Sequence, residues 1–344
     1  MFRVHLSAED LARTRVTATW GPFAETVLSL GGLRGGSRPA PPLRPWREAT
    51  QAAVDSRQAE LARFLWPFPG MVVDLLTLVG AVDSFDTGAA ALAARSGADL
   101  RTELGRFRDT DLGTELGLPR PARLPAWLTG LDQADPQALR MLTRVLSRSH
   151  ERLIEPFWPS MLSHLTGERA RMGRLLADHG VEHLFHHLHP GIRWHAPALE
   201  FADRGSWSPQ PCDVHLRGRG LVVVPSVFCG RVPIPLFPLD GGAALLLVPA
   251  PPELADAPAM WNGGSMIGDP LAALLGRTRA AVLRSLEGGT TTTELARRLR
   301  ITASGASQHA SALRAAGLVS SRRDRNRMVH ATTDLGAKLL DRIG

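Results

Sequence analysis

Tyrosine does not occur in this chain of 344 residues, and Lys338 is its only lysine. Nearly all of the basic residues are therefore arginines, in a chain that is also rich in Ala, Gly, Pro and Leu. This composition is typical of GC-rich coding sequences, so abundant arginine alone carries little functional information. Cysteine is equally scarce, because Cys212 and Cys229 are too few and too far apart for a disulfide scaffold or a Cys-rich zinc module.

Long hydrophobic runs are also missing. No stretch approaches the roughly 18 uninterrupted apolar residues that a membrane-spanning helix needs. The segment Met1–Leu11 places charged side chains where a signal peptide would need an apolar core. With 44% hydrophobic and 21% charged residues, the composition is that of two or three compact domains. We expect a cytoplasmic protein that does not contact a membrane.

Motifs of common enzyme classes are absent from the sequence. It has no G-x-S-x-G, no phosphate-binding P-loop and no dinucleotide fingerprint, and the glycines of Gly31–Gly36 are not followed by Lys-Ser or Lys-Thr. We therefore predict no catalytic residues and no cofactor, and we expect that the protein is not an enzyme.

Positive charge is concentrated towards the C-terminus. Residues 270–344 contain 13 Lys and Arg and 5 Asp and Glu, whereas the other 269 residues contain 27 basic and 28 acidic residues. The net charge of +7 therefore belongs to the last 75 residues. A basic domain joined to a neutral one is expected where only the basic domain contacts nucleic-acid phosphates.

The first part of the chain is predicted to be a mostly helical domain with a small antiparallel β-meander. Helical patterns dominate residues 22–188 and include one long helix over Trp46–Trp66. From Pro190 the period changes to short β-type runs separated by Gly, Pro and Asp. These runs lie at 192–194, 199–202, 214–216, 221–224, 232–237 and 243–248.

A linker and a second domain follow. Pro249–Asp269 is rich in Pro and Gly, so we place the boundary within it. The predicted fold class is α+β, with a regulatory domain over residues 1–262 and a winged helix-turn-helix over residues 263–344. Its strongest local signals are the capping box formed by Thr291 and Glu294, and Thr302 as the cap of the next helix. The three predicted helices are Pro270–Leu286, Thr291–Arg300 and Ala303–Ala316.

The third of these helices has one apolar and one polar face. Ala306, Ala310 and Leu313 are three or four residues apart and are expected to face the core, with His309 between the faces. Gln and Arg side chains can bond base edges bidentately, whereas Ser and His suit phosphates or bases. The helix N-terminus itself favours a phosphate. The polar face consists of Ser304, Ser307, Gln308, Ser311 and Arg314.

A β-hairpin, which we call the wing, is predicted after this helix. Its arginines have the charge and reach to contact the sugar-phosphate backbone or a minor groove. These arginines are Arg322, Arg323, Arg325 and Arg327, on strands predicted over Leu318–Arg323 and Met328–Thr333. The last predicted helix, Thr333–Ile343, carries a leucine stripe suited to docking on a partner.

These residues resemble the winged helix-turn-helix of the ArsR family of bacterial repressors. The family run S-x-H-x-x-x-L-R-x-A-G-L-V occurs at Ser307–Val319, and Arg322–Arg327 matches its R-R-x-G-R wing, with Asn326 near the usual glycine position. The resemblance implies a homodimer on a twofold-symmetric operator in double-stranded DNA, with the third helix in the major groove and the wing beside it. The predicted DNA-binding residues are Thr302, Ser304, Ser307, Gln308, His309, Ser311, Arg314, Arg322, Arg323, Arg325, Asn326 and Arg327.

Two further comparisons with this family concern metals and length. Its metal sensors carry a Cys-x-Cys pair in the recognition region or His and Asp ligands on the terminal helix. Here Ser307–Ala310 has no thiol, and the terminal helix has Asp334 and Asp341 without a histidine, so metal sensing at those sites is not expected. The whole chain resembles long actinobacterial ArsR-like regulators with an N-terminal extension, through LHPGIRW at 188–194 and GRGLVVVPSVF at 218–228.

Our hypothesis is a transcriptional repressor whose N-terminal region modulates DNA binding, with a small-molecule effector held between the helices and the meander as one means. One alternative is a metal-responsive regulator, because His residues four apart on a helix can bind a divalent metal. Another is an enzyme or cofactor carrier that uses the winged helix for docking. The histidines in question are His179, His183, His186, His187 and His189.

Overall fold

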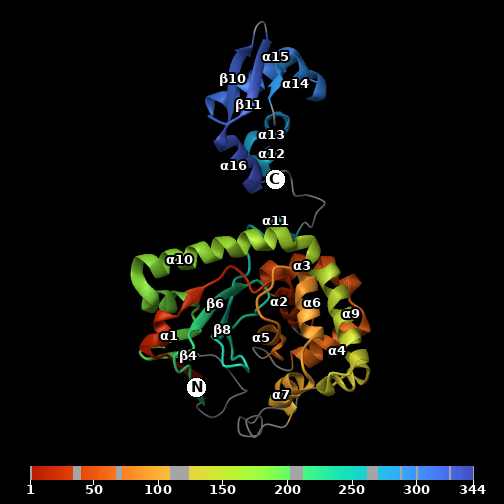
Figure 1. Ribbon diagram of the computed structural model, residues 1–344, viewed down its shortest axis with the longest axis vertical. Coiled ribbons are helices and arrows are strands. Elements are labelled where there is room, and N and C mark those ends of the chain that lie inside the picture. Colours follow the sequence, from red (N-terminus) through yellow and green to blue (C-terminus); the bar gives the residue numbers. More distant parts are fainter. Residues whose placement is uncertain are drawn as a thin grey trace. The chain divides into compact units, whose positions relative to one another are not determined.

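The computed structural model describes residues 2–33, 40–66, 72–108, 124–201, 212–261, 270–286, 289–299, 301–324 and 327–343. The chain forms two compact units, Met1–Trp261 and Asn262–Gly344 (Figure 1). Helices and small sheets occur together, which confirms the α+β class. No helix in the described ranges has the length and apolar character needed to cross a membrane.

Helices make up most of the first unit. They are α1 (Ala8–Ala12), α2 (Pro22–Ser29), α3 (Arg44–Thr50), α4 (Ser56–Leu65), α5 (Leu75–Val79), α6 (Phe85–Ala93), α7 (Gly97–Arg108), α9 (Pro136–Leu153), α10 (Trp158–Leu188) and α11 (Ala257–Trp261). Short 3-10 turns join several of them: η1 (Leu30–Leu33), η2 (Pro41–Leu43), η3 (Gln51–Ala53), η4 (Ala126–Leu128), η5 (Leu131–Gln133) and η6 (Glu155–Phe157).

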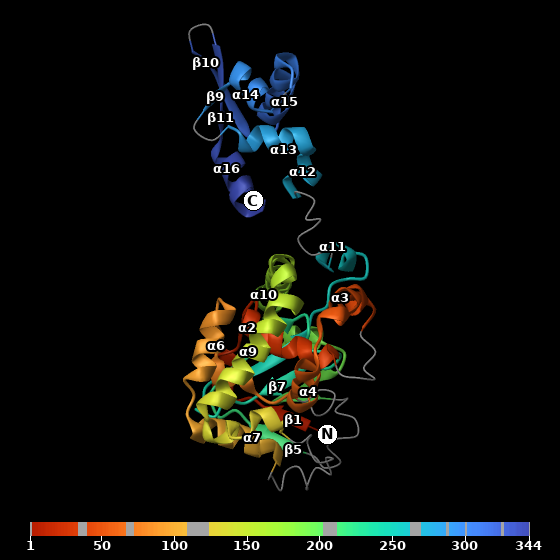
Figure 2. The same cartoon turned by 90° about the vertical axis from the view of Figure 1, so that its right-hand side faces the viewer.

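A mixed four-stranded sheet lies between two hydrophobic cores of this unit (Figures 1 and 2). Its strands, in spatial order, are β2 (Arg15–Val16), β6 (Leu221–Ser226), β8 (Ala244–Pro249) and β7 (Ile234–Leu236). Val222 and Val224 face the core made with the helices, whereas Leu221 and Val223 face the other core. Burial on both faces explains why β6 is an uninterrupted apolar run in the sequence.

A second four-stranded sheet contributes to the other core. Its order is β3 (Ile192–His195), β4 (Ala198–Phe201), β1 (Phe2–His5) and β5 (Cys212–His215). Leu184, Phe185 and Leu188 from the end of α10 pack into the same core. Gly180 interrupts α10 with φ of 85° and ψ of 174°, a left-handed φ that favours glycine.

The predicted antiparallel meander is wrong in its pairing. The strands after Pro190 are divided between the two sheets, and β1 and β2 from the N-terminus are inserted beside them. The β1–β5, β2–β6 and β6–β8 pairs are parallel. Alternation of apolar residues identifies a strand but not its neighbour, which is selected by long-range packing.

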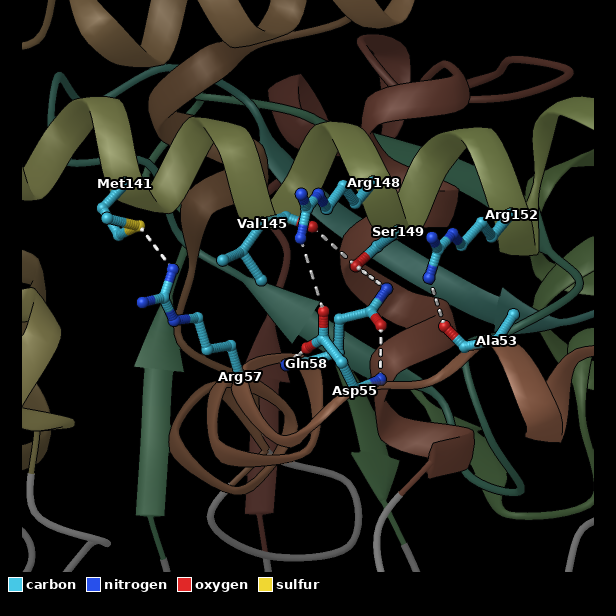
Figure 3. A network of polar contacts seen from close by, with 9 residues as sticks. All are labelled: Ala53, Asp55, Arg57, Gln58, Met141, Val145, Arg148, Ser149 and Arg152. Carbon is cyan, nitrogen blue, oxygen red and sulfur yellow. Dashed lines mark hydrogen bonds and ion pairs between the residues drawn. The ribbon is translucent and has the colours of Figure 1, made fainter.

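The predicted single helix Trp46–Trp66 is also wrong, because it is interrupted before Ser56. Asp55 caps α4: its Oδ1 accepts from Gln58 N–H at 2.9 Å, and Gln58 Oε1 accepts from Asp55 N–H at 2.9 Å. The Gln58 side chain donates to Ser149 Oγ on α9 at 3.0 Å (Figure 3). This reciprocal cap starts a new helix and fastens it to α9.

The second unit contains α12 (Pro270–Leu275), α13 (Arg277–Arg284), β9 (Thr290–Thr291), α14 (Thr292–Leu299), α15 (Ala303–Ala315), β10 (Val319–Asp324), β11 (Arg327–Thr332) and α16 (Asp334–Ile343). The predicted first helix is two helices, because Gly276 between them has φ of 83°. The sheet has the order β10-β11-β9, and β9 is a strand that the periodicity did not predict.

Candidate nucleic-acid interface

Helix α15 is held at its start by a cap and along one face by small apolar side chains. Thr302 Oγ1 accepts from Gly305 N–H at 3.1 Å, as predicted for an N-cap. Ala306, Ala310 and Leu313 have exposed fractions of 0%, 0% and 1%. The alanines allow a close approach to α13 and α14, both of which contact α15. The inward face is therefore the predicted one.

The opposite face of α15 is exposed to solvent. It presents Ser304, Ser307, Gln308, Ser311 and Arg314, with His309 half-buried at the edge. Within the described part of the chain, Ser304 Oγ lies 3.2 Å from Thr302 Oγ1, and the other four exposed side chains have no hydrogen-bond partner. Their donors and acceptors are thus available to an external ligand. An ordinary solvated helix face also exposes polar groups, so exposure alone does not identify that ligand.

The wing follows α15 and consists of β10 and β11. Ser321 pairs with His330, Arg322 with Val329 and Arg323 with Met328 in antiparallel register. The side chains of Arg322 and Arg323 are exposed, and neither forms an ion pair with an acidic residue among those described. The predicted contacts Arg325 and Asn326 lie outside the described residues, as does the side chain of Arg327.

His330 on β11 was missed as a site residue. Its side chain is buried, with 5% exposed. Nε2 lies 2.9 Å from Thr292 Oγ1 at the start of α14, and Nδ1 lies 2.7 Å from Ser321 Oγ on β10. Burial lowers the pKa of His330, and the positive charge of Arg314 lowers this pKa further. The sequence predicted a strand here, but alternation alone does not reveal which hydroxyl groups a strand residue will meet.

The C-terminal unit also matches a known family model. Residues 274–322 match the model described as "Helix-turn-helix domain". The C-terminal unit contains a DNA-binding helix-turn-helix. This assignment covers α14 and α15 and the first strand of the wing, and it is the domain type of transcriptional regulators. The match stops within β10.

Comparisons with individual proteins are sparse. Among solved structures, the chain is similar to that of NolR from Sinorhizobium fredii, with 33% sequence identity over 22% of this chain and 76% of that chain, and a TM-score of 0.20. No curated protein matches the chain significantly.

The histidines near the end of α10 form a row rather than a cage. The ring centroids of His179 and His183 are 4.5 Å apart, and those of His183 and His187 are 4.1 Å apart. His187 Nδ1 lies 2.8 Å from the backbone oxygen of His183, which occupies one ring nitrogen. In the ranges that the structure covers, no group of three or more His, Cys, Asp or Glu side chains is arranged to hold a metal ion.

The two cysteines do not lie in the same core. Cys229 is buried in the core made with the helices, and Cys212 lies at the edge of the other core. The sulfur of Cys229 lies 3.5 Å from the backbone oxygen of Val232. The arrangement fits small buried side chains better than a pair that forms a disulfide.

Proposed function

We propose that this protein is a transcriptional repressor of the ArsR-like winged-helix class, that it is not an enzyme, and that α15 binds the major groove of double-stranded DNA. The exposed polar face of α15 carries the proposal. Gln308 and Arg314 on this face have free donors suited to bidentate bonds with base edges. Ser304 and Ser307, near the N-terminus of the helix, are placed to meet a phosphate.

Charge supports the same surface. The excess positive charge of the chain belongs to residues 270–344. Arg314, Arg322 and Arg323 are exposed on α15 and on the wing that follows it, without acidic partners among the described residues. Each arginine that neutralises a phosphate releases a counterion, so binding should weaken steeply with salt. In this proposal the wing arginines hold the duplex and α15 reads it.

The proposal includes a homodimer on a twofold-symmetric operator. Helices α12 and α16 contact each other and expose leucines, with Leu274 64% and Leu335 58% exposed. Leu339 and Leu340 beside Leu335 are partly buried against the core of the same unit. A second copy that covers these leucines would remove apolar surface from water and relate two α15 helices by a twofold axis.

The N-terminal unit is proposed to modulate DNA binding through a small-molecule effector. Two of its buried acids have clear structural partners, which supports a role other than catalysis. Asp10 Oδ1 accepts from Gly220 N–H at 2.8 Å, and Glu25 Oε2 accepts from Phe228 N–H at 3.3 Å. Both bonds fasten the N-terminal segment to the residues that flank β6.

A genome-wide map of DNA bound by the full-length protein tests the function. The expected result is enrichment of short sequences with twofold symmetry, whose half-sites lie about one helical turn apart. Transcription from the adjacent promoters should rise when the protein is deleted. A uniform map, together with no retardation of the best-bound fragments in a gel-shift titration, would contradict the proposal.

A further inference from the structure

His330 lies where three elements of the C-terminal unit meet. It belongs to β11, it pairs with Thr290 of β9 across the sheet, and its ring reaches both β10 and the first residue of α14. Both ring nitrogens are engaged, one by Thr292 Oγ1 and the other by Ser321 Oγ. A single buried side chain therefore joins both strands of the wing to the helix-turn-helix.

The hydroxyl partners suit a neutral imidazole. A neutral ring has one N–H donor and one acceptor nitrogen, and each hydroxyl can either donate or accept. One of Thr292 and Ser321 can thus accept from the ring while the other donates to it. Both bonds fix the ring in its plane, because the two nitrogens are held from opposite directions. Loss of either hydroxyl would leave a buried ring nitrogen unsatisfied, which is costly.

The bond to Ser321 lies next to the proposed DNA-contacting surface. Ser321 immediately precedes Arg322 and Arg323 on β10, and Thr292 starts the helix that contacts α15. The position of β10 relative to α14 consequently determines where the two arginine side chains project with respect to the polar face of α15. His330 is the buried polar link that sets this position.

We propose that His330 is a positioning residue for DNA binding: through Thr292 and Ser321 it holds the wing against the helix-turn-helix so that Arg322 and Arg323 reach the phosphates while α15 occupies the groove. This inference rests on the proposed function. It assigns no DNA contact to His330 itself, which is buried. Removing the link should therefore loosen the phosphate contacts of the wing and leave base recognition by α15 in place.

The salt dependence of binding distinguishes positioning from general destabilisation. Each phosphate contact contributes about 0.9 to the slope of log affinity against log salt on duplex DNA. Loss of the contacts of Arg322 and Arg323 should lower this slope by about 2. A variant that is only less stable would bind with fewer active molecules but with an unchanged slope.

The test uses the full-length protein and a fluorescent duplex that carries the best-bound sequence, titrated by anisotropy at several salt concentrations. His330→Phe keeps an aromatic ring without hydrogen bonds and should lower the slope by about 2, whereas His330→Gln, which can both donate and accept, should restore most of it. Ser321→Ala should act in the same direction as His330→Phe. Ser320→Ala is the matched control, because Ser320 is the exposed neighbour and its hydroxyl donates to Ala331 O instead.

Three outcomes separate the possibilities. If the wild-type protein binds no duplex even at low salt, the proposed function fails and the inference with it. If the wild type binds with a steep slope and Ser321→Ala and His330→Phe keep that slope, the function stands and the positioning role is overturned. If His330→Phe does not fold, Ser321→Ala decides alone. In an Arg322→Ala/Arg323→Ala background, Ser321→Ala should change the slope no further, and an additional loss there would also overturn the inference.

Discussion

The two units of this chain use arginine in different ways. In the N-terminal unit several arginines lie beside acids of the same unit: Arg3 beside Glu200 at 3.0 Å, Arg13 beside Glu9 at 2.8 Å and Arg171 beside Glu168 at 3.0 Å. In the C-terminal unit, Arg298 pairs with Glu294, but Arg314, Arg322 and Arg323 have no acidic partner among the described residues. Basic side chains without internal partners, gathered on one helix and hairpin, are those expected to meet an external polyanion.

The cores differ as well. All 8 tryptophans and all 11 phenylalanines lie before residue 262, so the C-terminal unit is built from aliphatic side chains alone. The N-terminal unit also buries an acid, Glu25, with 2% exposed, against the backbone after β6. A small aliphatic core is sensitive to the loss of single methylene groups, whereas the larger unit is sensitive to the charge state of its buried acid. Tryptophan fluorescence consequently reports on the N-terminal unit only.

The largest expected effect is on the smaller core. Leu313→Ala removes a fully buried side chain and should lower the free energy of unfolding of the C-terminal unit by about 2 to 5 kcal/mol. DNA binding should be lost, while denaturant unfolding followed by tryptophan fluorescence should stay unchanged. Ala312→Ser on the exposed side of the same helix serves as the control. A shift of the fluorescence transition in Leu313→Ala would show that the two units unfold together.

Glu25 should make the larger unit sensitive to pH. Burial raises the pKa of Glu25 from 4.5 to about 7, although bonds from Ser226, Phe228 and Val227 oppose this rise. The folded protein therefore holds a proton between pH 4.5 and 7 that the unfolded chain releases, so this group's contribution to stability is full below pH 4.5 and declines as pH rises towards 7. The decline amounts to roughly 3 kcal/mol.

Denaturant unfolding followed by tryptophan fluorescence from pH 5 to pH 8 measures this effect. Glu25→Gln should flatten the profile relative to wild type, whereas Glu48→Gln at an exposed position of α3 should leave it unchanged. Parallel profiles for wild type and Glu25→Gln would refute the assignment of this pH dependence to Glu25.

Base recognition should depend on α15. Gln308→Ala and Arg314→Ala should each weaken binding to the preferred sequence by about 1 to 3 kcal/mol and relax base preference. Competition gel shifts with single-base variants of the best-bound sequence measure both effects. Equal discrimination by wild type and by both variants would remove α15 as the element that reads the bases.

The smallest expected effect is at the cap of α15. Thr302→Ala removes the acceptor for Gly305 N–H and should cost the C-terminal unit about 1 kcal/mol, whereas Thr302→Ser should cost less because it retains the hydroxyl. Thermal unfolding followed by far-ultraviolet circular dichroism compares the two. Equal losses in both variants would mean that the hydroxyl bond contributes nothing to this helix.

Local signals in the sequence predicted local structure well. The cap at Thr302, the inward alanines of α15 and its exposed polar face all follow from short spacings, because helix geometry relates residues three or four apart. Gly276 did not announce the break between α12 and α13, since a glycine within a helical pattern is tolerated as often as it ends one. The helix boundary at Asp55 was missed although the Asp-x-x-Gln cap is visible in the sequence.

Long-range partnerships were not predictable in this way. The insertion of β1 and β2 beside strands some 200 residues later depends on packing that no short window contains. The link from His330 to Thr292 joins residues 38 positions apart and depends on which face of β11 is buried. The predicted contacts on α15 and the wing remain predictions until DNA binding is measured.

The central claim is that the arginines of α15 and the wing, and not those of the N-terminal unit, contact DNA. Affinity of the full-length protein for duplex DNA across a salt series tests it most directly. The triple variant Arg314→Ala/Arg322→Ala/Arg323→Ala should lower the salt slope by about 3, whereas Arg63→Ala/Arg101→Ala/Arg140→Ala, which removes three exposed arginines of the N-terminal unit, should leave it unchanged. Equal slopes for the first triple variant and the wild type, or an equal loss in both triple variants, would contradict the account.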